Sequence, residues 1–313
     1  MRTFTSWTGL QAADKGASVA IGNFDGVHIG HQAVIDIARR YAIKTGAPLG
    51  ILTFEPHPRQ VFAKDAPPFR LMSAETKAHR LEKLGVDHLY QLEFTSELFG
   101  LTPDEFTRDV LNNGLGLGHI VVGADFCFGK GRAGNAATLQ AAGKTLGFDV
   151  TIAKLIETGG QEVSSTNIRK ALAAGLPRDA ATMLGHWHRI DGPVLHGDKR
   201  GKGLGFPTAN MSIKDLHPPK FGVYAVKIDV LSGPHQGSYN GAASMGVRPM
   251  FGENTPNLET YIFDFAGDIY DTHVSVALIE YLRPELKFDG LDALITQMNT
   301  DCDRARAILA AEA

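Results

Sequence analysis

The sequence predicts an α/β protein of two domains, in which a domain built on a mainly parallel sheet is followed by a small β-barrel with a C-terminal helix. In the first half, short apolar runs alternate with segments of helical periodicity, a pattern typical of parallel sheets with right-handed crossovers. Between His186 and Phe288 the pattern changes to closely spaced strand-like segments, punctuated by glycine and proline. The 313 residues suffice for two hydrophobic cores. We therefore expect domains at residues 1–185 and 186–313.

The elements of the first half follow from apolar runs and helix-start signals. A strand is expected at Ser18–Ile21 and a helix at His31–Thr45, where apolar residues recur at helical spacing. The best-marked helix begins at Thr102, which forms a capping box with Glu105 and has Pro103 at the first helical position. Further strands are expected at Leu49–Phe54, Asp87–Leu92, His119–Gly123 and Phe148–Lys154, and further helices at Ser73–Leu84, Ser164–Leu172 and Arg178–Leu184. A proline-bearing loop is expected from Pro56 to Pro68.

The second half predicts a closed or nearly closed barrel. Apolar, β-branched and aromatic residues cluster in short runs that are separated by turn residues. The strands are expected at Gly222–Val230, Gly237–Met245, Leu258–Phe265 and Thr272–Leu282. The one long helical pattern of this half, Leu291–Ala311, places its apolar residues on one face and caps the barrel.

Composition and charge limit the function classes. The apolar content of 43% and charged content of 21% are ordinary for a globular protein, and the net charge of −3 gives no reason to expect nucleic acid as a partner. Cys127 and Cys302 form no CxxC pair and are expected to be free thiols. With no leader pattern and no apolar run long enough to cross a bilayer, we expect a cytoplasmic protein with small-molecule partners and no membrane contact. A homo-oligomer is left open.

The segment Gly22–His31, GNFDGVHIGH, joins the first expected strand to the first expected helix. Its glycines allow the backbone to approach a ligand closely, and the free N–H groups of the helix N-terminus favour phosphate. His28 and His31 meet on one side of the first turn, where they can donate hydrogen bonds or positive charge to a phosphate. The alternative is that the two histidines only cap the helix. The segment is not a Walker A loop, and it resembles the HxGH signature of the nucleotidyltransferase superfamily.

Two further segments of the first half favour a nucleotide site. The glycine-flanked aromatic residues of VVGADFCFG, Phe126 and Phe128, can hold a flat ring beside Asp125, although core packing explains them almost as well. The segment Ser164–Leu172, SSTNIRKAL, begins with helix-capping residues and places Arg169 in the first two turns. It is suited to a leaving pyrophosphate, and its alternative interpretation is a plain helix cap.

The second half contains its own candidate phosphate loop. HGDKRGKGLGFPTAN, His196–Asn210, has glycines that permit a backbone wrapped around phosphates and lysine and arginine residues that supply charge. Thr208 and Asn210 lie two apart on an extended segment and offer oxygen atoms that suit Mg²⁺ carried by a nucleotide. Glu259 opens a strand and can accept a proton from a substrate hydroxyl. The alternatives are a solvated basic turn and a surface glutamate.

Taken in order, these segments resemble the prokaryotic bifunctional riboflavin kinase/FAD synthetase family over nearly the whole chain. GNFDGVHIGH, TFEPHP, VVGADFCFG and SSTNIR are similar to the adenylyltransferase module, which is Rossmann-like. GPVLHGDKRGKGLGFPTAN, FGVYAV, NGAASMGVRPMFG and LETYIFDF are similar to the riboflavin kinase module. The resemblance implies that ATP phosphorylates riboflavin to FMN and that a second ATP adenylylates FMN to FAD, with release of pyrophosphate.

The resemblance also implies residue roles. In the kinase module, Glu259 is the general base and Thr208 and Asn210 hold Mg²⁺. In the adenylyltransferase module, His28 and His31 stabilise the charge that develops on the α-phosphate. The residues expected to bind ATP or flavin are Gly22, Phe24, Asp25, Gly26, Asp125, Phe126, Phe128, Ser164, Thr166 and Arg169 in the first module and Gly201, Lys202 and Gly203 in the second.

This chain departs from the family pattern at several positions of the kinase module. Met250 stands where threonine is usual, Asp271 where glycine is usual, and Lys202 where arginine is commoner. One alternative is therefore a chain that retains only FAD synthesis, with the kinase weakened through Met250 and Asp271. Two others are a flavin- or nucleotide-binding regulator on the same scaffold and a cytidylyl- or aminoacyl-type transferase, although the kinase motifs have no place in the last.

Overall fold

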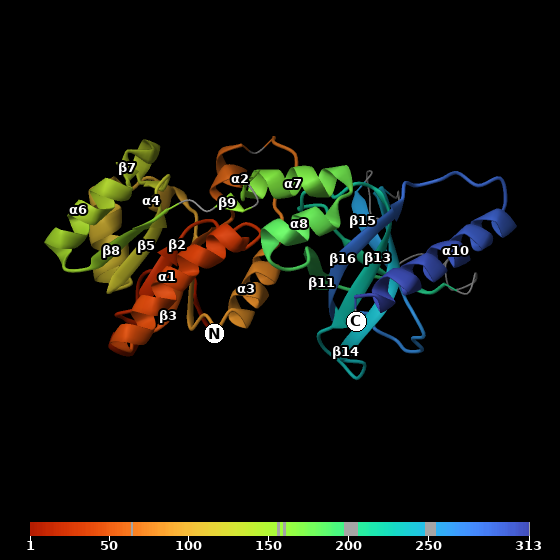
Figure 1. The fold of residues 1–313 in the computed structure, drawn as a ribbon. Coiled ribbons are helices and arrows are strands. Elements are labelled where there is room, and N and C mark those ends of the chain that lie inside the picture. Colours follow the sequence, from red (N-terminus) through yellow and green to blue (C-terminus); the bar gives the residue numbers. More distant parts are fainter. Residues whose placement is uncertain (64, 155–156, 159–160, 197–205, 248–254, 313) are drawn as a thin grey trace. The chain divides into compact units, whose positions relative to one another are not determined.

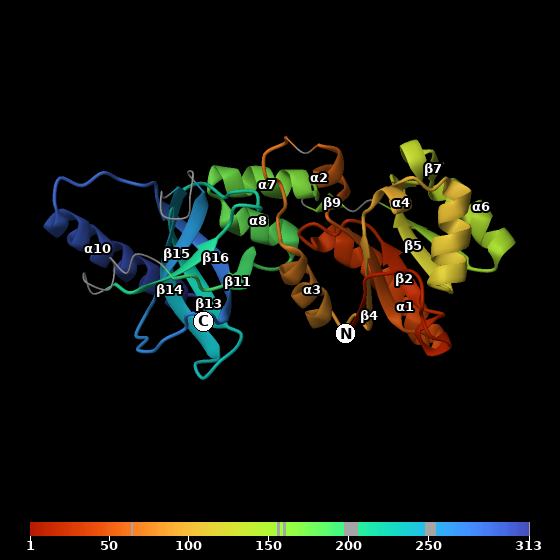
Figure 2. The ribbon, with the colours of Figure 1, turned by 180° about the vertical axis from the view of Figure 1, so that it is seen from behind.

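The structure is a computed structural model that describes residues 1–63, 65–154, 157–158, 161–196, 206–247 and 255–312 (Figures 1 and 2). The chain forms two compact units, and each is described by itself. The first unit consists of Met1–Ala66 and Lys77–Val163, and the second of Pro67–Thr76 and Ser164–Ala313.

The first unit is built on a six-stranded sheet in the order β1-β4-β3-β2-β5-β8. Every adjacent pair is parallel, which confirms the predicted sheet type. The strands are β1 (Arg2–Phe4), β2 (Ser18–Ile21), β3 (Leu49–Glu55), β4 (His88–Glu93), β5 (His119–Gly123) and β8 (Asp149–Ala153). Successive strands run outward from β2 on one side, while β5 lies on its other side, so the strand order reverses between β2 and β5. Open parallel sheets bind ligands at the carboxyl ends of strands beside such a reversal.

The helices of this unit are α1 (Ile29–Thr45), α2 (Pro58–Phe62), α3 (Ala74–Lys83, which begins in the second unit), α4 (Ser96–Phe99), α5 (Pro103–Glu105), its π-helical continuation η2 (Phe106–Gly114) and α6 (Ala136–Leu146). They include those predicted, together with α2, α4 and α6, which were not expected. The predicted capping box is confirmed, since Thr102 and Glu105 cap each other's backbone. The loop expected from Pro56 to Pro68 contains α2, because Pro58 occupies its first turn and His57 caps it. The short elements are η1 (Ala12–Asp14), β6 (Cys127–Phe128), η3 (Lys130–Arg132), β7 (Gly134–Asn135), β9 (Glu157–Thr158) and β10 (Gln161–Glu162).

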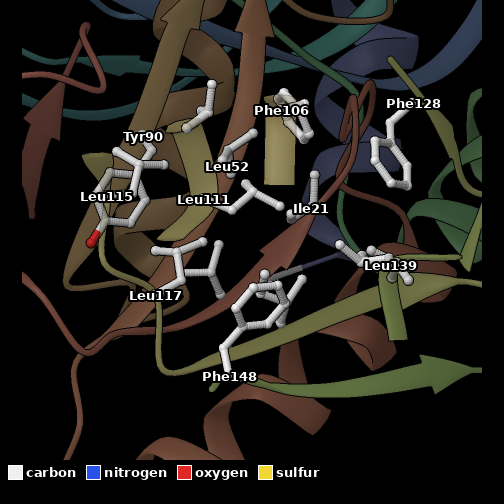
Figure 3. Close-up of a cluster of buried hydrophobic side chains, with 14 of the residues drawn as sticks. Ile21, Leu52, Tyr90, Phe106, Leu111, Leu115, Leu117, Phe128, Leu139 and Phe148 are labelled. Carbon is white, nitrogen blue, oxygen red and sulfur yellow. The ribbon is translucent and has the colours of Figure 1, made fainter. Parts of the chain in front are cut away.

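Both faces of the parallel sheet are covered, as its nearly continuous apolar strands require. Helix α1 lies against β2, β3 and β5 on one face (Figure 1). On the other face, side chains of β2 and β3 such as Ile21 and Leu52 pack with Phe106 and Leu111 of η2 and Leu139 of α6 (Figure 3). This core fixes the carboxyl ends of the strands, where the candidate site lies.

The second unit contains a six-stranded antiparallel sheet in the order β11-β16-β13-β14-β15-β12 (Figure 2). Its strands are β11 (Arg189–Pro193), β12 (Thr208–Ser212), β13 (Gly222–Val230), β14 (Gly237–Val247), β15 (Pro256–Ile262) and β16 (His273–Arg283). The segment that follows β11 meets β12, the last strand of this order, because Leu195 N donates to Asn210 O at 2.8 Å. The sheet is therefore a nearly closed barrel, as predicted. Its interior is filled by apolar side chains such as Ile190, Tyr224 and Val276.

The helices α7 (Ser165–Ala174), α8 (Pro177–Leu184) and α10 (Leu291–Ala310) accompany the barrel. The C-terminal helix packs Ala305 and Leu309 against the sheet. It is also held by Asp301, which receives hydrogen bonds from Arg283 Nη2 at 2.7 Å and Nε at 2.9 Å. In the part of the chain that the structure describes, no helix is both long and apolar enough to span a membrane.

Candidate functional site

The predicted histidine pair lies where β2 passes into α1. His28 is the N-cap of α1, and its Nδ1 accepts the backbone N–H of His31 at 3.2 Å. The two imidazole rings stack with centroids 3.6 Å apart and planes inclined by 14°. Because Nδ1 of His28 is an acceptor, its neutral ring carries the proton on Nε2. His28 therefore caps the helix with one ring nitrogen and retains the other as a donor.

Backbone geometry explains why this loop contains glycine. Gly26 has a φ of 92°, and the non-glycine residues Phe24 and Val27 also have positive φ values of 51° and 43°. Such values are unusual for a bulky or β-branched residue and store strain, which is common in ligand-binding loops. At Gly30, an added Cβ would lie 3.1 Å from the His28 ring. The absence of a side chain there allows the two rings to stack.

Burial keeps the histidine pair neutral near pH 7. It lowers the pKa of His28 to about 4. The pKa of His31 is held well below its ordinary value, first by burial and then by the positive charges of His28 and Lys77. Among the described residues no hydrogen-bond partner reaches His31 Nδ1, although that atom is buried. The pair is thus polar but uncharged near pH 7 in this structure.

The other loop at the strand-order reversal follows β5. Asp125 is exposed, Phe126 is half-buried and Phe128 is buried. The two phenylalanine rings stack at 5.5 Å, and Phe128 belongs to the hydrophobic core of the unit. Core packing therefore accounts for Phe128 and in part for Phe126, whereas Asp125 remains exposed. Phe24 belongs to the loop of residues 22–28 between β2 and α1, which we call the histidine loop. It is also buried, and its ring meets that of His31 edge-on, with the ring centroids 5.2 Å apart.

The SSTNIR segment lies in the second unit, at the N-terminus of α7. Ser164 is the N-cap and accepts the backbone N–H of Asn167 at 3.3 Å. Thr166 is exposed in the first turn. Arg169 donates from Nε to the carbonyl of Phe69, and its guanidinium lies 5.4 Å from the centre of the Phe69 ring. The segment is a helix cap, and its N-terminus with Thr166 and Arg169 also has the chemistry of an anion site.

Three kinase-side predictions come together across two neighbouring strands. Asn210 on β12 lies directly opposite Glu259 on β15, and Thr208 is opposite Tyr261. Opposed residues of an antiparallel pair share a face, so the Asn210 amide and the Glu259 carboxylate project to the same side. The Asn210 amide nitrogen donates to Thr208 O at 3.3 Å, which leaves its side-chain oxygen as an acceptor. Glu259 is oriented by Asn257, whose amide nitrogen donates to its Oε1 at 3.2 Å.

The donor set of this face fits a magnesium ion carried by a nucleotide. Thr208 and Asn210 supply oxygen atoms, which Mg²⁺ prefers, and Mg²⁺ on a nucleotide needs only one or two protein ligands. Within the described ranges, no group of three or more histidine, cysteine, aspartate and glutamate side chains is arranged to hold a metal. Gly201, Lys202, Gly203 and Met250 lie outside the described residues. Asp271 is described and has a φ of 59°, a conformation that glycine adopts readily, which explains why glycine is usual there.

Sequence reasoning missed a buried cation in the first unit. Lys77 on α3 has a side chain only 2% exposed, and its Nζ lies 2.7 Å from Glu55 Oε1. The motif TFEPHP, which ends β3, is similar to the adenylyltransferase module, but nothing in the sequence around Lys77 distinguishes this residue from a surface lysine. The signal that identifies it is tertiary, because only the packing of α3 brings it to the carboxyl end of the sheet.

The fold and site together define an enzyme of nucleotide-dependent group transfer, with a Rossmann-like nucleotidyltransferase unit and a barrel on which Asn210 lies opposite the Glu259 carboxylate. Comparison with known proteins agrees. The family model for FAD synthetase matches residues 10–167, and that for riboflavin kinase matches residues 184–309.

Whole-chain relatives have the same two functions. A bifunctional riboflavin kinase/FMN adenylyltransferase of Pseudomonas fluorescens is 42% identical, over 97% of this chain and 96% of its own. The protein of that name in Escherichia coli K12 is 38% identical, over 93% of this chain and 92% of its own. A crystal structure named as a macrolide-efflux protein from Streptococcus pneumoniae has a TM-score of 0.81 at 29% identity, over 97% of this chain and 98% of that one. This chain belongs to the bifunctional riboflavin kinase/FMN adenylyltransferase family, and it phosphorylates riboflavin and adenylylates FMN.

Proposed function

We propose that Glu259, Thr208 and Asn210 carry the kinase reaction. The 5′-hydroxyl oxygen of the ribityl chain forms a bond to the γ-phosphorus of ATP, the bond to the β,γ-bridging oxygen breaks, and ADP leaves. Glu259 accepts the hydroxyl proton, and its hydrogen bond from Asn257 holds the carboxylate in one orientation. A base contributes typically ~10²–10⁴-fold, while positioning and charge neutralisation supply most of the remainder in phosphoryl transfer.

Thr208 and Asn210 are the residues proposed to hold Mg²⁺ with ATP. The ion would neutralise phosphate charge when bound. The proposal is supported by the hydrogen bond that Asn210 makes to Thr208 O, because it turns the amide oxygen away from its own strand. Gly201, Lys202 and Gly203 are proposed to cradle the ATP phosphates in this module.

For the second reaction, we propose that His28 and His31 stabilise the reacting α-phosphate. A phosphate oxygen of FMN bonds to the α-phosphorus of ATP, the bond to the α,β-bridging oxygen breaks, and pyrophosphate leaves. His28 donates from Nε2, the nitrogen that its capping role leaves protonated. The negative charge of the triphosphate favours the protonated form of the two histidines. Binding of ATP therefore raises their lowered pKa values toward the ordinary range of histidine.

The remaining assignments concern substrate binding. Gly22, Phe24, Asp25 and Gly26 are proposed to line the nucleotide, with Phe24 acting through its edge-on contact with His31. The other proposed binding residues are Asp125, Phe126 and Phe128 near the flavin or nucleotide, and Ser164, Thr166 and Arg169 at the pyrophosphate.

The functional boundary is proposed at residues 185 and 186, close to the start of the riboflavin kinase match at residue 184, whereas the compact units separate earlier, after Val163. We propose that the enzyme works in the cytoplasm, where ATP and riboflavin are available; its two cysteines are free. The oligomeric state is left to measurement.

The main support for these assignments is that each module has its own pair of adjacent polar side chains. The pairs are His28 with His31 and Asn210 with Glu259. The test follows flavins by chromatography after incubation with ATP and Mg²⁺. Glu259→Gln should stop FMN formation from riboflavin and leave conversion of added FMN to FAD intact. His31→Asn should do the reverse. Loss of both activities, or of neither, in either folded variant would contradict the assignment.

A further inference from the structure

Lys77 is buried where a lysine is costly. Its side chain is 2% exposed, and burying an ammonium group without partners is strongly unfavourable. The group is compensated by Glu55 Oε1 at 2.7 Å and by two hydrogen bonds, to Thr53 Oγ1 at 3.0 Å and to Asn23 O at 3.4 Å. Thr53 in turn donates its hydroxyl proton to Asn23 O at 3.2 Å. The donor directions are therefore mutually consistent.

These partners come from the carboxyl ends of two neighbouring strands. Thr53 and Glu55 lie at the end of β3, and Asn23 lies in the histidine loop directly after β2. The Asn23 carbonyl receives both Lys77 and Thr53, so this peptide is attached to β3 and α3 at one point. The next residue, Phe24, already has a positive φ of 51° and touches the His31 ring. A shift of the Asn23 peptide would therefore move the support of His31.

We propose that Lys77 is a positioning residue for adenylyl transfer, whose ammonium group holds the Asn23 peptide against β3 and so keeps the His28–His31 pair in its reactive arrangement. This inference rests on the proposed role of the histidines. It goes beyond that role because Lys77 lies on a different helix and acts through the backbone of the loop. A misplacement of about 1 Å at a reacting group costs on the order of 10²-fold in rate.

The test uses the full chain, because its kinase reaction reports on the folding of the second unit in the same sample. Lys77→Met retains most of the side-chain volume and removes the charge and the donors. We expect its kcat for FMN adenylylation to fall about 10- to 100-fold, with a much smaller change in KM for ATP and an unchanged kinase rate.

A second variant separates positioning from simple charge balance. In Lys77→Met with Glu55→Gln, no uncompensated carboxylate remains beside the methionine. We expect adenylylation to stay slow, because the Asn23 carbonyl has still lost its lysine donor. Recovery of the parent kcat in this double variant would overturn the proposal, since Lys77 would then serve only to neutralise Glu55. A folded Lys77→Met enzyme with the parent kcat would also overturn it.

If Lys77→Met does not fold, the Thr53→Val variant tests the positioning role instead. It removes the hydroxyl that links Lys77 to Asn23 and keeps the shape of the side chain. A lowered kcat at similar KM supports the proposal, and an unchanged kcat overturns it. His31→Asn, measured in parallel, distinguishes the two hypotheses. If it remains active, the proposed histidine role fails; if it is inactive while the Lys77 and Thr53 variants are fully active, only the positioning role fails.

Discussion

Acidification should destabilise the barrel unit through His188. This residue precedes β11 and is 2% exposed. Burial, with the positive charges that His186 and His217 can carry, lowers its pKa from 6.5 to about 3. Between these two values the unfolded chain binds a proton that the folded chain does not, so the free energy of unfolding falls as the pH falls. At pH 5, about 1.5 pH units below the unfolded pKa, the loss is roughly 2 kcal/mol, since each unit corresponds to ~1.4 kcal/mol.

The chain offers a convenient fluorescent probe for this measurement. It has 2 tryptophans, and Trp187 packs beside the C-terminal helix in the second unit while Trp7 lies in the first. In a Trp7→Phe background, urea unfolding followed by tryptophan fluorescence therefore reports on the barrel unit. The matched control is His188→Gln, which is neutral at every pH.

The comparison is the drop in unfolding free energy between pH 7 and pH 5 in the parent and in His188→Gln. Other groups titrate equally in both proteins, so the difference between the two drops isolates His188. We expect the parent to lose about 2 kcal/mol more than the variant. Equal drops in the two proteins would refute the reasoning, because they would mean that folded His188 takes up a proton as readily as the unfolded chain.

The remaining predictions concern geometry and helix docking. Gly30→Ala would bring a Cβ to 3.1 Å from the His28 ring, so we expect slower FMN adenylylation with an unchanged kinase rate; equal adenylylation rates would show that the ring stack is not needed. Asp301→Ala leaves the Arg283 guanidinium without the carboxylate that accepts both its Nε and Nη2 groups, so we expect a loss of ~3–5 kcal/mol of barrel-unit stability in urea. Asp301→Asn retains one acceptor and should lose less, and equal losses in the two variants would contradict this explanation.

Local signals in the sequence predicted most of the fold. The bounds of β2, β5 and β13 are those expected. An apolar run that ends at a glycine or a polar turn can be recognised as a strand from neighbouring residues alone. The capping box at Thr102 is equally local. Several strands were not predicted, and β1 and β11 are examples. β1 has only three residues and little burial, and β11 includes a glycine and a proline, so neither has a strand pattern of its own.

The candidate site likewise has features that a short sequence motif predicts and features that depend on the packed sheet. The motif Gly22–His31 predicted a strand–loop–helix junction for phosphate, because glycine permissiveness and helix N-terminal donors belong to the segment itself. The opposition of Asn210 and Glu259 depends instead on which strands pair and in which register. That register is set by turns and by the packing of a whole sheet, so no single segment contains it.

Most element types, the two-part organisation, the family and the candidate polar residues for the two reactions could be predicted from the sequence alone. Only the tertiary structure decided that the barrel closes at Asn210, that burial makes the histidine pair neutral, and that Lys77 reaches the histidine loop. The difference arises from the distance along the chain over which each kind of interaction acts. Propensities, caps and motifs act over a few residues along the chain, whereas desolvation and ion pairing depend on neighbours that packing brings together from distant segments.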